Sequence, residues 1–388
     1  MDILSKYLSN MSPTSDGTNL EEKSDSLKCL ASIFAKYGGV LGKIAQVLSF
    51  ENENSNVFSE SKPFSSKKTH KYATTELFSS DKFKDLEMEN KIFKNGSLGQ
   101  VYKGVKDGKN IIMKVQYCGL DQQAKEDFGI INMLIKFLYS TNTLENAVKD
   151  IKNKMEEELN YENEKSNQLK FAEIYKDVSE ISIPNVIPEL CDGKTVVMDF
   201  MDGFEDMTSF ITNSTQEQKN TIGNTLLKFT FENIYKHSLF YSDNHYGNFL
   251  VKEDKLCVLD FGCVSVIEEP LSRSLKNIHK YLYEKDKDNF VKTMKDAGIL
   301  SESTSDESVD YCYSFFSLQY QPLLEEDFVI TDEWVDKVGE KDMLMMKEWS
   351  LPPNWIYLHK IPYGLYHILG KMNMKTNCSK YLYETYCK

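Results

Sequence analysis

Two short motifs near the middle of the sequence contain the residue types that phosphoryl transfer requires. The first holds Asp243 and Asn248 in the spacing Asp-x-x-x-x-Asn, and the second is Asp260-Phe261-Gly262. Phosphoryl transfer needs carboxylate and amide oxygens that hold Mg²⁺ against the phosphates, and a carboxylate that faces the attacking group. Each motif alone could be a chance turn, because Asp and Asn are common in loops. Together and in this order, they predict that Asp243 meets the nucleophile and that Asn248 and Asp260 bind the metal.

A glycine-containing loop and a lysine in an apolar run precede these motifs. Glycines between two strands let backbone N–H groups approach a phosphate closely, and a lysine on the next strand can reach phosphates as a point charge. An ordinary hairpin with a surface lysine is the alternative, but Lys114 lies within the apolar run Ile111–Val115, which favours an ion-pairing role. The predicted phosphate-binding loop consists of Asn95, Gly96, Ser97, Leu98 and Gly99. The partner of Lys114 must be a glutamate on a later helix, and the candidates are Glu157, Glu158, Glu162 and Glu164.

Patterns of apolar residues predict a small strand-rich part followed by a larger helical part. Asp107-Gly108 between two apolar runs is a hairpin signal, and a second hairpin is expected between the two motifs. Asp199, Phe200 and Met201 fall at the connection between the two parts and should meet an adenine ring. The predicted strands are Asn90–Gly104, Asn110–Val115, Val196–Met201, Phe249–Val251 and Leu256–Leu259, and predicted helices include 121–140, 144–176 and 271–283. This is the pattern of an α+β, protein-kinase-like bilobal fold.

The length, net charge and cysteine content of the chain limit the classes of protein to which it can belong. The chain has 388 residues, enough for two compact domains or one large two-lobed domain. Its 46 Lys plus Arg against 59 Asp plus Glu give a formal net charge of −13, which argues against binding nucleic acid. No apolar run is long enough to predict a transmembrane segment, and the eight cysteines form no CxxC pair. We therefore expect a soluble intracellular protein in a reducing compartment, most simply the cytoplasm; its oligomeric state does not follow from the sequence.

The order of these patterns predicts four regions. Residues 1–19 form a polar tail, 20–70 a helical extension with a loop, 71–202 a small lobe with a long helical insertion, and 203–388 a helical large lobe. No Ala-Pro-Glu follows Gly262, and the chain enters the helix predicted at 271–283 almost directly. This leaves no room for a long activation loop, so ordinary peptide substrates are not expected.

Several elements along the chain resemble one known family in the same order. These are Lys43–Ser49, similar to a Lys-x-Gly-Gln element; Phe93–Val101, similar to an alanine-rich loop; Met113–Gly119, similar to a lysine strand; Glu158–Glu164, similar to a Glu-x-Asp element; and Leu358–Lys360 with Gly364. From about Leu20 to Cys378 the sequence thus resembles the UbiB family of atypical kinases, also called aarF-domain-containing kinases, and within it the branch linked to coenzyme Q biosynthesis.

The resemblance implies residue roles that spacing alone leaves open. It makes Glu164 the expected partner of Lys114. It also places Lys43 and Gln46 of the extension against Glu158 and Asn160, as a latch over the nucleotide site.

Ala45 stands where the family has Gly and Lys360 where it has Arg, and two further departures bear on the nucleotide site. Asn160 stands where the family has Asp, so the contact with Lys43 should be weaker than a charge-assisted one. Lys94-Asn95-Gly96 replaces alanines, so the loop over the phosphates should be more polar and more flexible.

The predicted function is that of a UbiB-type kinase or ATPase that uses ATP and Mg²⁺, with a lipid or protein acceptor and a link to lipid or quinone metabolism. One alternative is a phosphotransferase acting on proteins or small molecules, which the glycine in the loop would favour. Another is a catalytically silent nucleotide-binding module that regulates a partner by changing shape. Asp243 favours catalysis, because a pure binding module has no need of a carboxylate at that position.

Overall fold

The computed structural model describes residues 77–120 except 79 and 97, isolated positions between 122 and 157, and residues 159–348 and 361–388. Side chains at 342–348 and 361–363 are not described. The predicted extension over 20–70, with Lys43 and Gln46, lies outside the described residues. So do Ser97, Glu158 and most of the predicted insertion between 121 and 158.

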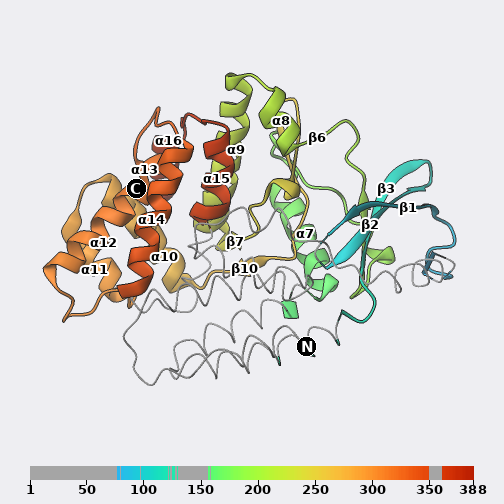
Figure 1. Ribbon diagram of the computed structural model, residues 1–388, viewed down its shortest axis with the longest axis horizontal. Coiled ribbons are helices and arrows are strands. Elements are labelled where there is room, and N and C mark those ends of the chain that lie inside the picture. The colour runs from blue at the N-terminus through green and yellow to red at the C-terminus, as the bar shows by residue number, and fades with distance from the viewer. Residues whose placement is uncertain are drawn as a thin grey trace, which may run out of the picture. The chain divides into compact units, whose positions relative to one another are not determined.

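The first half of the described chain contains a four-stranded antiparallel sheet in the order β1-β2-β3-β5 (Figure 1). Its strands are β1 Glu87–Asn95, β2 Gly99–Lys106, β3 Lys109–Gln116 and β5 Thr195–Asp199. The long run predicted from 90 to 104 is therefore two strands, because the chain turns between Asn95 and Gly99. The predicted Asp107-Gly108 hairpin is confirmed: both residues have positive φ, 50° and 76°, as the tight turn between two twisted strands requires.

Helix α7 (Tyr161–Tyr175) precedes β5 and buries one face, which carries Tyr161, Glu164, Gln168, Phe171 and Tyr175. This spacing of three or four residues places all five side chains on the same side of the helix. Within the predicted helical stretch 144–176, the helix begins only after Asn160, whose side-chain oxygen accepts the N–H of Glu162 at 3.1 Å. An Asn at this position satisfies one of the N–H groups that a helix start leaves without a partner.

The second half is mostly helical, with two small sheets in the orders β4-β9-β8-β6 and β10-β7. The short strands are β4 Ile181–Ser182, β6 Glu205–Asp206, β7 Leu239–Tyr241, β8 Phe249–Lys252, β9 Lys255–Val258 and β10 Val264–Val266. The α-helices are α8 Met207–Asn213, α9 Gln216–His237, α10 Glu269–Tyr283, α11 Lys287–Asp296, α12 Asp306–Gln319, α13 Gln321–Leu324, α14 Asp332–Glu348, α15 His367–Lys371 and α16 Ser379–Tyr386. Short 3₁₀ or π turns are η2 Pro188–Leu190, η3 Tyr246–Asn248 and η5 Ile361–Tyr366.

The hairpin predicted between the two motifs is present as β8 and β9, and the helix predicted at 271–283 is α10. Strands β4, β6, β7 and β10 were not predicted. Each has only two or three residues, too few for the alternation of apolar and polar side chains that marks a strand.

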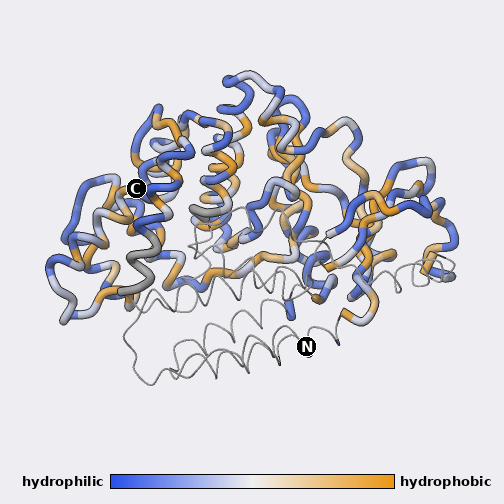
Figure 2. The backbone as a smooth tube through the Cα atoms, in the orientation of Figure 1, coloured by the Kyte–Doolittle hydropathy of each residue, from blue (hydrophilic) through white to orange (hydrophobic). Residues whose placement is uncertain are grey.

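Helix α9 lies at the centre of the helical core. Figure 2 shows hydrophobic stretches along α9 and the neighbouring strands, and hydrophilic turns at the periphery. The buried Asn224 on α9 donates its amide to Lys375 O at 2.8 Å and accepts the N–H of Asn377 at 2.9 Å. The segment that follows α15 therefore supplies hydrogen-bond partners to the Asn224 side chain in the middle of the core.

In the part of the chain that the structure describes, no helix combines the length and apolar character needed to cross a membrane. None of the seven cysteines in this part of the chain is in a disulfide, and of these only Cys118 is exposed.

Candidate functional site

A buried ion-pair cluster joins three segments that are far apart in the sequence. Lys114 Nζ on β3 lies 2.8 Å from both carboxylate oxygens of Glu164 on α7, and 2.9 Å from Oδ2 of Asp260 after β9. The Glu164 side chain is 2% exposed, whereas those of Lys114 and Asp260 are 20% and 31% exposed. The ammonium thus bridges a buried carboxylate and one that still faces solvent. This geometry suits a lysine that binds an anionic ligand.

The charge state of Lys114 follows from its neighbours. Burial disfavours the ammonium form, but the carboxylates of Asp260 and Glu164 more than offset this, so the pKa of Lys114 is raised well above its usual range. The Tyr161 ring lies 5.0 Å below the ammonium. Burial raises the pKa of the Tyr161 phenol, which therefore stays neutral beside the cluster. Lys114 is a permanent cation at any physiological pH.

Helix α7 also fixes the Asp-Phe-Gly segment. Asn167 donates its side-chain amide to Phe261 O at 3.0 Å, one turn after Glu164 on the same helix. The Phe261 ring is fully buried, 5.0 Å from Phe171 and 5.8 Å from Tyr241. Two contacts therefore fix the position of Asp260. Its neighbour Phe261 is buried in the core, and its own carboxylate binds Lys114.

One strand pairing and one backbone hydrogen bond place Asp243 near this segment. Strand β7 leads into Asp243 and pairs with β10, which follows Gly262, and Ser242 N donates to Cys263 O at 3.0 Å. Within the loop, Asn248 donates its amide to Asp243 Oδ2 at 2.9 Å and to Asp243 O at 3.0 Å. The two predicted residues of the first motif therefore contact each other directly.

The loop between β1 and β2 is compact. Gly96 N donates to Gly99 O at 2.8 Å, and Tyr117 Oη donates to Gly96 O at 3.1 Å. A Cβ at Gly99 would lie 2.8 Å from Tyr161 Oη and still closer to the Val115 carbonyl oxygen, so only glycine fits there. The loop therefore lies directly against β3, close to the residue that follows Lys114.

Asn248 and Asp260 supply oxygen donors suited to a hard divalent cation. Asp260 Oδ1 accepts the N–H of Gly262 at 3.0 Å, which orients the carboxylate. Among the described residues, no group of three or more His, Cys, Asp or Glu side chains could form an all-protein metal cage. One carboxylate and one amide fit instead a Mg²⁺ ion that also takes oxygens from a nucleotide.

Comparison with known proteins now decides the family. The ABC1 atypical kinase-like domain matches residues 56–294, more than half of the chain. This chain belongs to the ABC1, or UbiB, family. The predicted resemblance is thereby confirmed at the level of the family.

Two named relatives agree with this assignment, and one solved structure shows the same fold. Atypical kinase COQ8 of Saccharomyces cerevisiae is 25% identical over 380 residues, covering 91% of this chain and 74% of that protein. The probable serine/threonine-protein kinase abkA of Dictyostelium discoideum is 26% identical over 276 residues, 64% of this chain and 49% of that protein. The fold resembles that of Rv3197 from Mycobacterium tuberculosis, solved in complex with erythromycin, with a TM-score of 0.67, 22% identity and coverage of 94% and 96% of the two chains.

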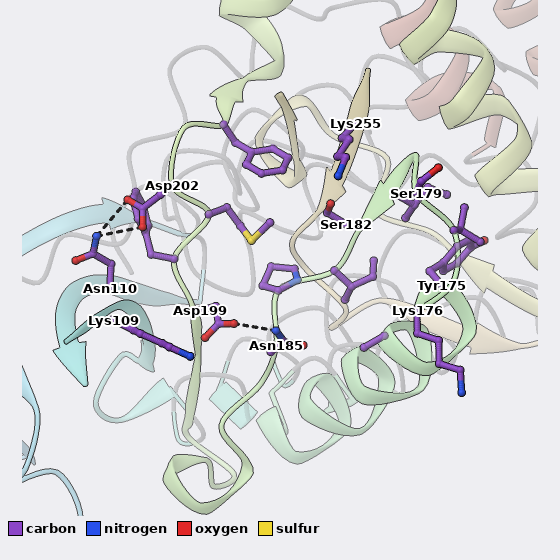
Figure 3. Close-up of a pocket in the computed structure, with 18 of the residues that line it drawn as sticks. Lys109, Asn110, Tyr175, Lys176, Ser179, Ser182, Asn185, Asp199, Asp202 and Lys255 are labelled. Carbon is purple, nitrogen blue, oxygen red and sulfur yellow. Dashed lines mark hydrogen bonds between the residues drawn. The ribbon is translucent and has the colours of Figure 1, made fainter. Parts of the chain in front are cut away.

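In this ABC1 chain the segment Asp199–Met201 borders a pocket of about 900 Å³ (Figure 3). Its walls come from the β2–β3 turn, the end of α7 with the following loop, and Lys255 on β9. The Asp199 carboxylate accepts the Asn185 amide at 2.9 Å. The pocket is lined by none of Lys114, Glu164, Asp243, Asn248 and Asp260. It is therefore separate from the charged cluster, and among the predicted site residues that the structure describes, Asp199–Met201 alone border it.

The predicted latch is described only at Asn160. Its side chain is exposed, and its oxygen caps α7, so the departure from Asp leaves an equally good helix cap. The contact with Lys43, Gln46 and Glu158 lies outside the described residues and stays a prediction.

Three contributors to the site were not found from the ABC1 sequence. Tyr161 and Asn167 lie three residues either side of Glu164, and this spacing on one helix face was a usable signal. Lys94 is the third: its Nζ donates to Gly247 O at 3.2 Å, a contact across 153 positions that no local pattern could indicate.

Proposed function

We propose that this chain binds Mg-ATP between the β1–β3 sheet and the loops that carry Asp243 and Asp260, in a bilobal kinase-like arrangement, and catalyses ATP hydrolysis or phosphoryl transfer. The observation that carries the proposal is Lys114 bound at once to Glu164 and Asp260. A lysine tied to a helix on one side and to the Asp-Phe-Gly carboxylate on the other is the arrangement that a kinase-type site uses to hold nucleotide phosphates.

Each residue of the cluster has a role in this proposal. Lys114 would contact phosphate oxygens, and Glu164 keeps its ammonium in place. Asp243 would accept a hydrogen bond from the attacking water or hydroxyl, with Asn248 orienting its carboxylate as the 2.9 Å contact does here. Asn248 and Asp260 would hold Mg²⁺, which neutralises charge on the phosphates when bound.

The adenine would meet the backbone of Asp199–Met201. The N–H groups of Asp199 and Phe200 already donate to Asn185 O at 2.9 Å and Asn110 O at 3.0 Å, so this segment is held as an extension of the sheet. We propose a lipid-, quinone- or protein-linked acceptor on the strength of the family and of its kinase-named members.

Asp260→Asn tests nucleotide binding. In the wild type, Mg-ATP at 100 times its dissociation constant should raise the free energy of unfolding by about 2.7 kcal/mol, and the variant should lose most of this gain. Asp254→Asn, on the exposed turn between β8 and β9, makes the same charge change away from the site and should keep it. Equal stabilisation of wild type and Asp260→Asn by Mg-ATP would reject the assignment.

Asp243→Asn separates an enzyme from a silent binding module. The variant should bind Mg-ATP nearly as tightly as the wild type but release phosphate at least 100-fold more slowly, since proton acceptance contributes about 10²–10⁴-fold to such reactions. Unchanged turnover in the variant would show that Asp243 does not accept the proton, and no turnover in the wild type with lipid and protein candidates present would favour the silent module.

A further inference from the structure

Lys94, the second-last residue of β1, reaches across to the loop that contains Asp243 and Asn248. Its Nζ donates to the carbonyl oxygen of Gly247 at 3.2 Å. Gly247 directly precedes Asn248 and comes four residues after Asp243. The ammonium of Lys94 is therefore placed at the loop that carries Asp243 and Asn248.

Both partners of this contact are held in position. On one side, Gly96 N–Gly99 O and Gln100 Nε2–Asn95 Oδ1, at 2.8 and 3.2 Å, fix the turn that follows Lys94. On the other, Gly247 donates its N–H to His245 Nδ1 at 3.1 Å. A Cβ at Gly247 would lie 3.5 Å from Lys94 Nζ, so the ammonium packs against this glycine.

The charges of the site explain what such a lysine could do. Lys114 is one ammonium among three carboxylates, those of Glu164, Asp260 and Asp243, and two of these already bind it directly. The described cluster is thus short of positive charge for a triphosphate. The Gly247 carbonyl, in contrast, is a neutral acceptor that uses one of the three N–H donors of Lys94. A phosphate oxygen is a much stronger acceptor for an ammonium.

We propose that Lys94 contacts the terminal phosphate of the bound nucleotide, as a second phosphate-binding lysine in addition to Lys114. This inference rests on the proposed function. In phosphoryl transfer the terminal phosphate lies between the nucleophile-facing carboxylate and the metal ligands. That is the stretch from Asp243 to Asn248, which Lys94 already contacts at Gly247. Its four-carbon side chain can move from the Gly247 carbonyl to a phosphate oxygen without a change in the backbone.

The experiment compares Mg-ATP with Mg-ADP. Lys94→Met removes the charge and keeps most of the side-chain length, Lys94→Arg keeps the charge, and Lys91→Met is the matched control at another exposed lysine of β1. Loss of one charge-assisted hydrogen bond to the terminal phosphate should weaken Mg-ATP binding by Lys94→Met about tenfold. Mg-ADP binding should change less than about twofold, because ADP lacks that phosphate. Lys94→Arg should retain most of the ATP affinity, and Lys91→Met should match the wild type for both nucleotides.

The outcomes separate this inference from the proposed function. If the wild type does not bind Mg-ATP, the proposed function fails, and Lys94 has no phosphate to contact. If the wild type binds Mg-ATP but Lys94→Met weakens ATP and ADP equally, or neither, only the inference fails. Faster turnover or tighter ATP binding in Lys94→Met would also overturn the inference, because the contact between Lys94 and Gly247 would then hinder nucleotide binding.

Discussion

Gly99 is the residue at which the geometry of the site leaves least freedom. A side chain there would meet Tyr161 Oη at 2.8 Å and the Val115 carbonyl oxygen even more closely. Both groups belong to the elements that carry the ion-pair cluster, since Val115 follows Lys114 on β3 and Tyr161 begins α7. A change of one hydrogen to a methyl group at this position must therefore push the loop, the strand or the helix out of place.

We expect Gly99→Ala to lower the free energy of unfolding by about 1–3 kcal/mol, the usual effect of overpacking. Urea denaturation of both proteins measures this. Gly193→Ala is the matched control, because its Cβ would meet only Asn160 Oδ1 at an ordinary 3.6 Å, and it should stay within about 0.5 kcal/mol of the wild type. Similar values for the two variants would contradict the close approach at Gly99.

The residues of the site differ in how far the sequence could predict them. Asp243, Asn248 and Asp260 stand close together in the sequence and are joined by a hairpin, so their spacing carried the prediction. The choice of Glu164 among four glutamates needed the family resemblance, because the start of α7 at Asn160 decides which glutamate faces β3. The contact between Lys94 and Gly247 joins distant segments and depends on tertiary structure alone.

Helix α7 is the element on which the cluster depends. It presents Glu164 to Lys114 and Asn167 to Phe261 O, so its first two turns join β3 to the Asp-Phe-Gly segment. At its start, Tyr161 N donates to Gly193 O, and the side-chain cap is the contact from Glu162 N to Asn160 Oδ1. Weakening this cap should loosen the turn that carries Glu164 before it affects the rest of the helix.

Asn160→Ala should lower the free energy of unfolding by about 1 kcal/mol and speed amide exchange at the first turn of α7. Asn160→Asp keeps an oxygen at the same place and adds a negative charge at the helix start, so it should be neutral or stabilising. Hydrogen exchange of Tyr161–Glu164 together with urea denaturation distinguishes the two. An equal loss in both variants would show that the capping oxygen is not what holds the turn.

At the scale of the whole molecule, the helical part is stabilised by side-chain contacts between helices that are far apart in the sequence. His279 on α10 is fully buried, with Nε2 3.1 Å from Leu323 O and Nδ1 3.3 Å from Cys387 Sγ. Aromatic rings of three other elements surround it, those of Tyr235, Tyr320 and Tyr383. Burial lowers the pKa of this imidazole to about 4, so it stays neutral in the folded protein well below the pH at which an exposed histidine is protonated.

Acid should therefore weaken the fold through His279. Between its unfolded pKa of about 6.5 and its folded pKa of about 4, the unfolded state binds one more proton, so stability falls as pH falls through this window. The contribution should reach about 3 kcal/mol near pH 4. His279→Gln does not titrate, so the difference in unfolding free energy between wild type and variant should shrink from pH 7 to pH 4.5. A difference that is constant with pH would show that His279 does not titrate in this way.

The hydrogen bonds from Asn224 to Lys375 and Asn377 have a consequence for how the chain is made. A ribosome adds about 5–20 residues per second, so roughly 8–30 s separate the appearance of α9 from that of its partners. During that time the Asn224 side chain lacks its contacts with Lys375 and Asn377 and has only its contact with Asn220 O on the same helix, and the apolar surface beside it stays uncovered. The helical part should therefore complete its packing only after its last segment has been translated, and nascent chains stalled before about residue 370 should remain sensitive to protease and dependent on chaperones.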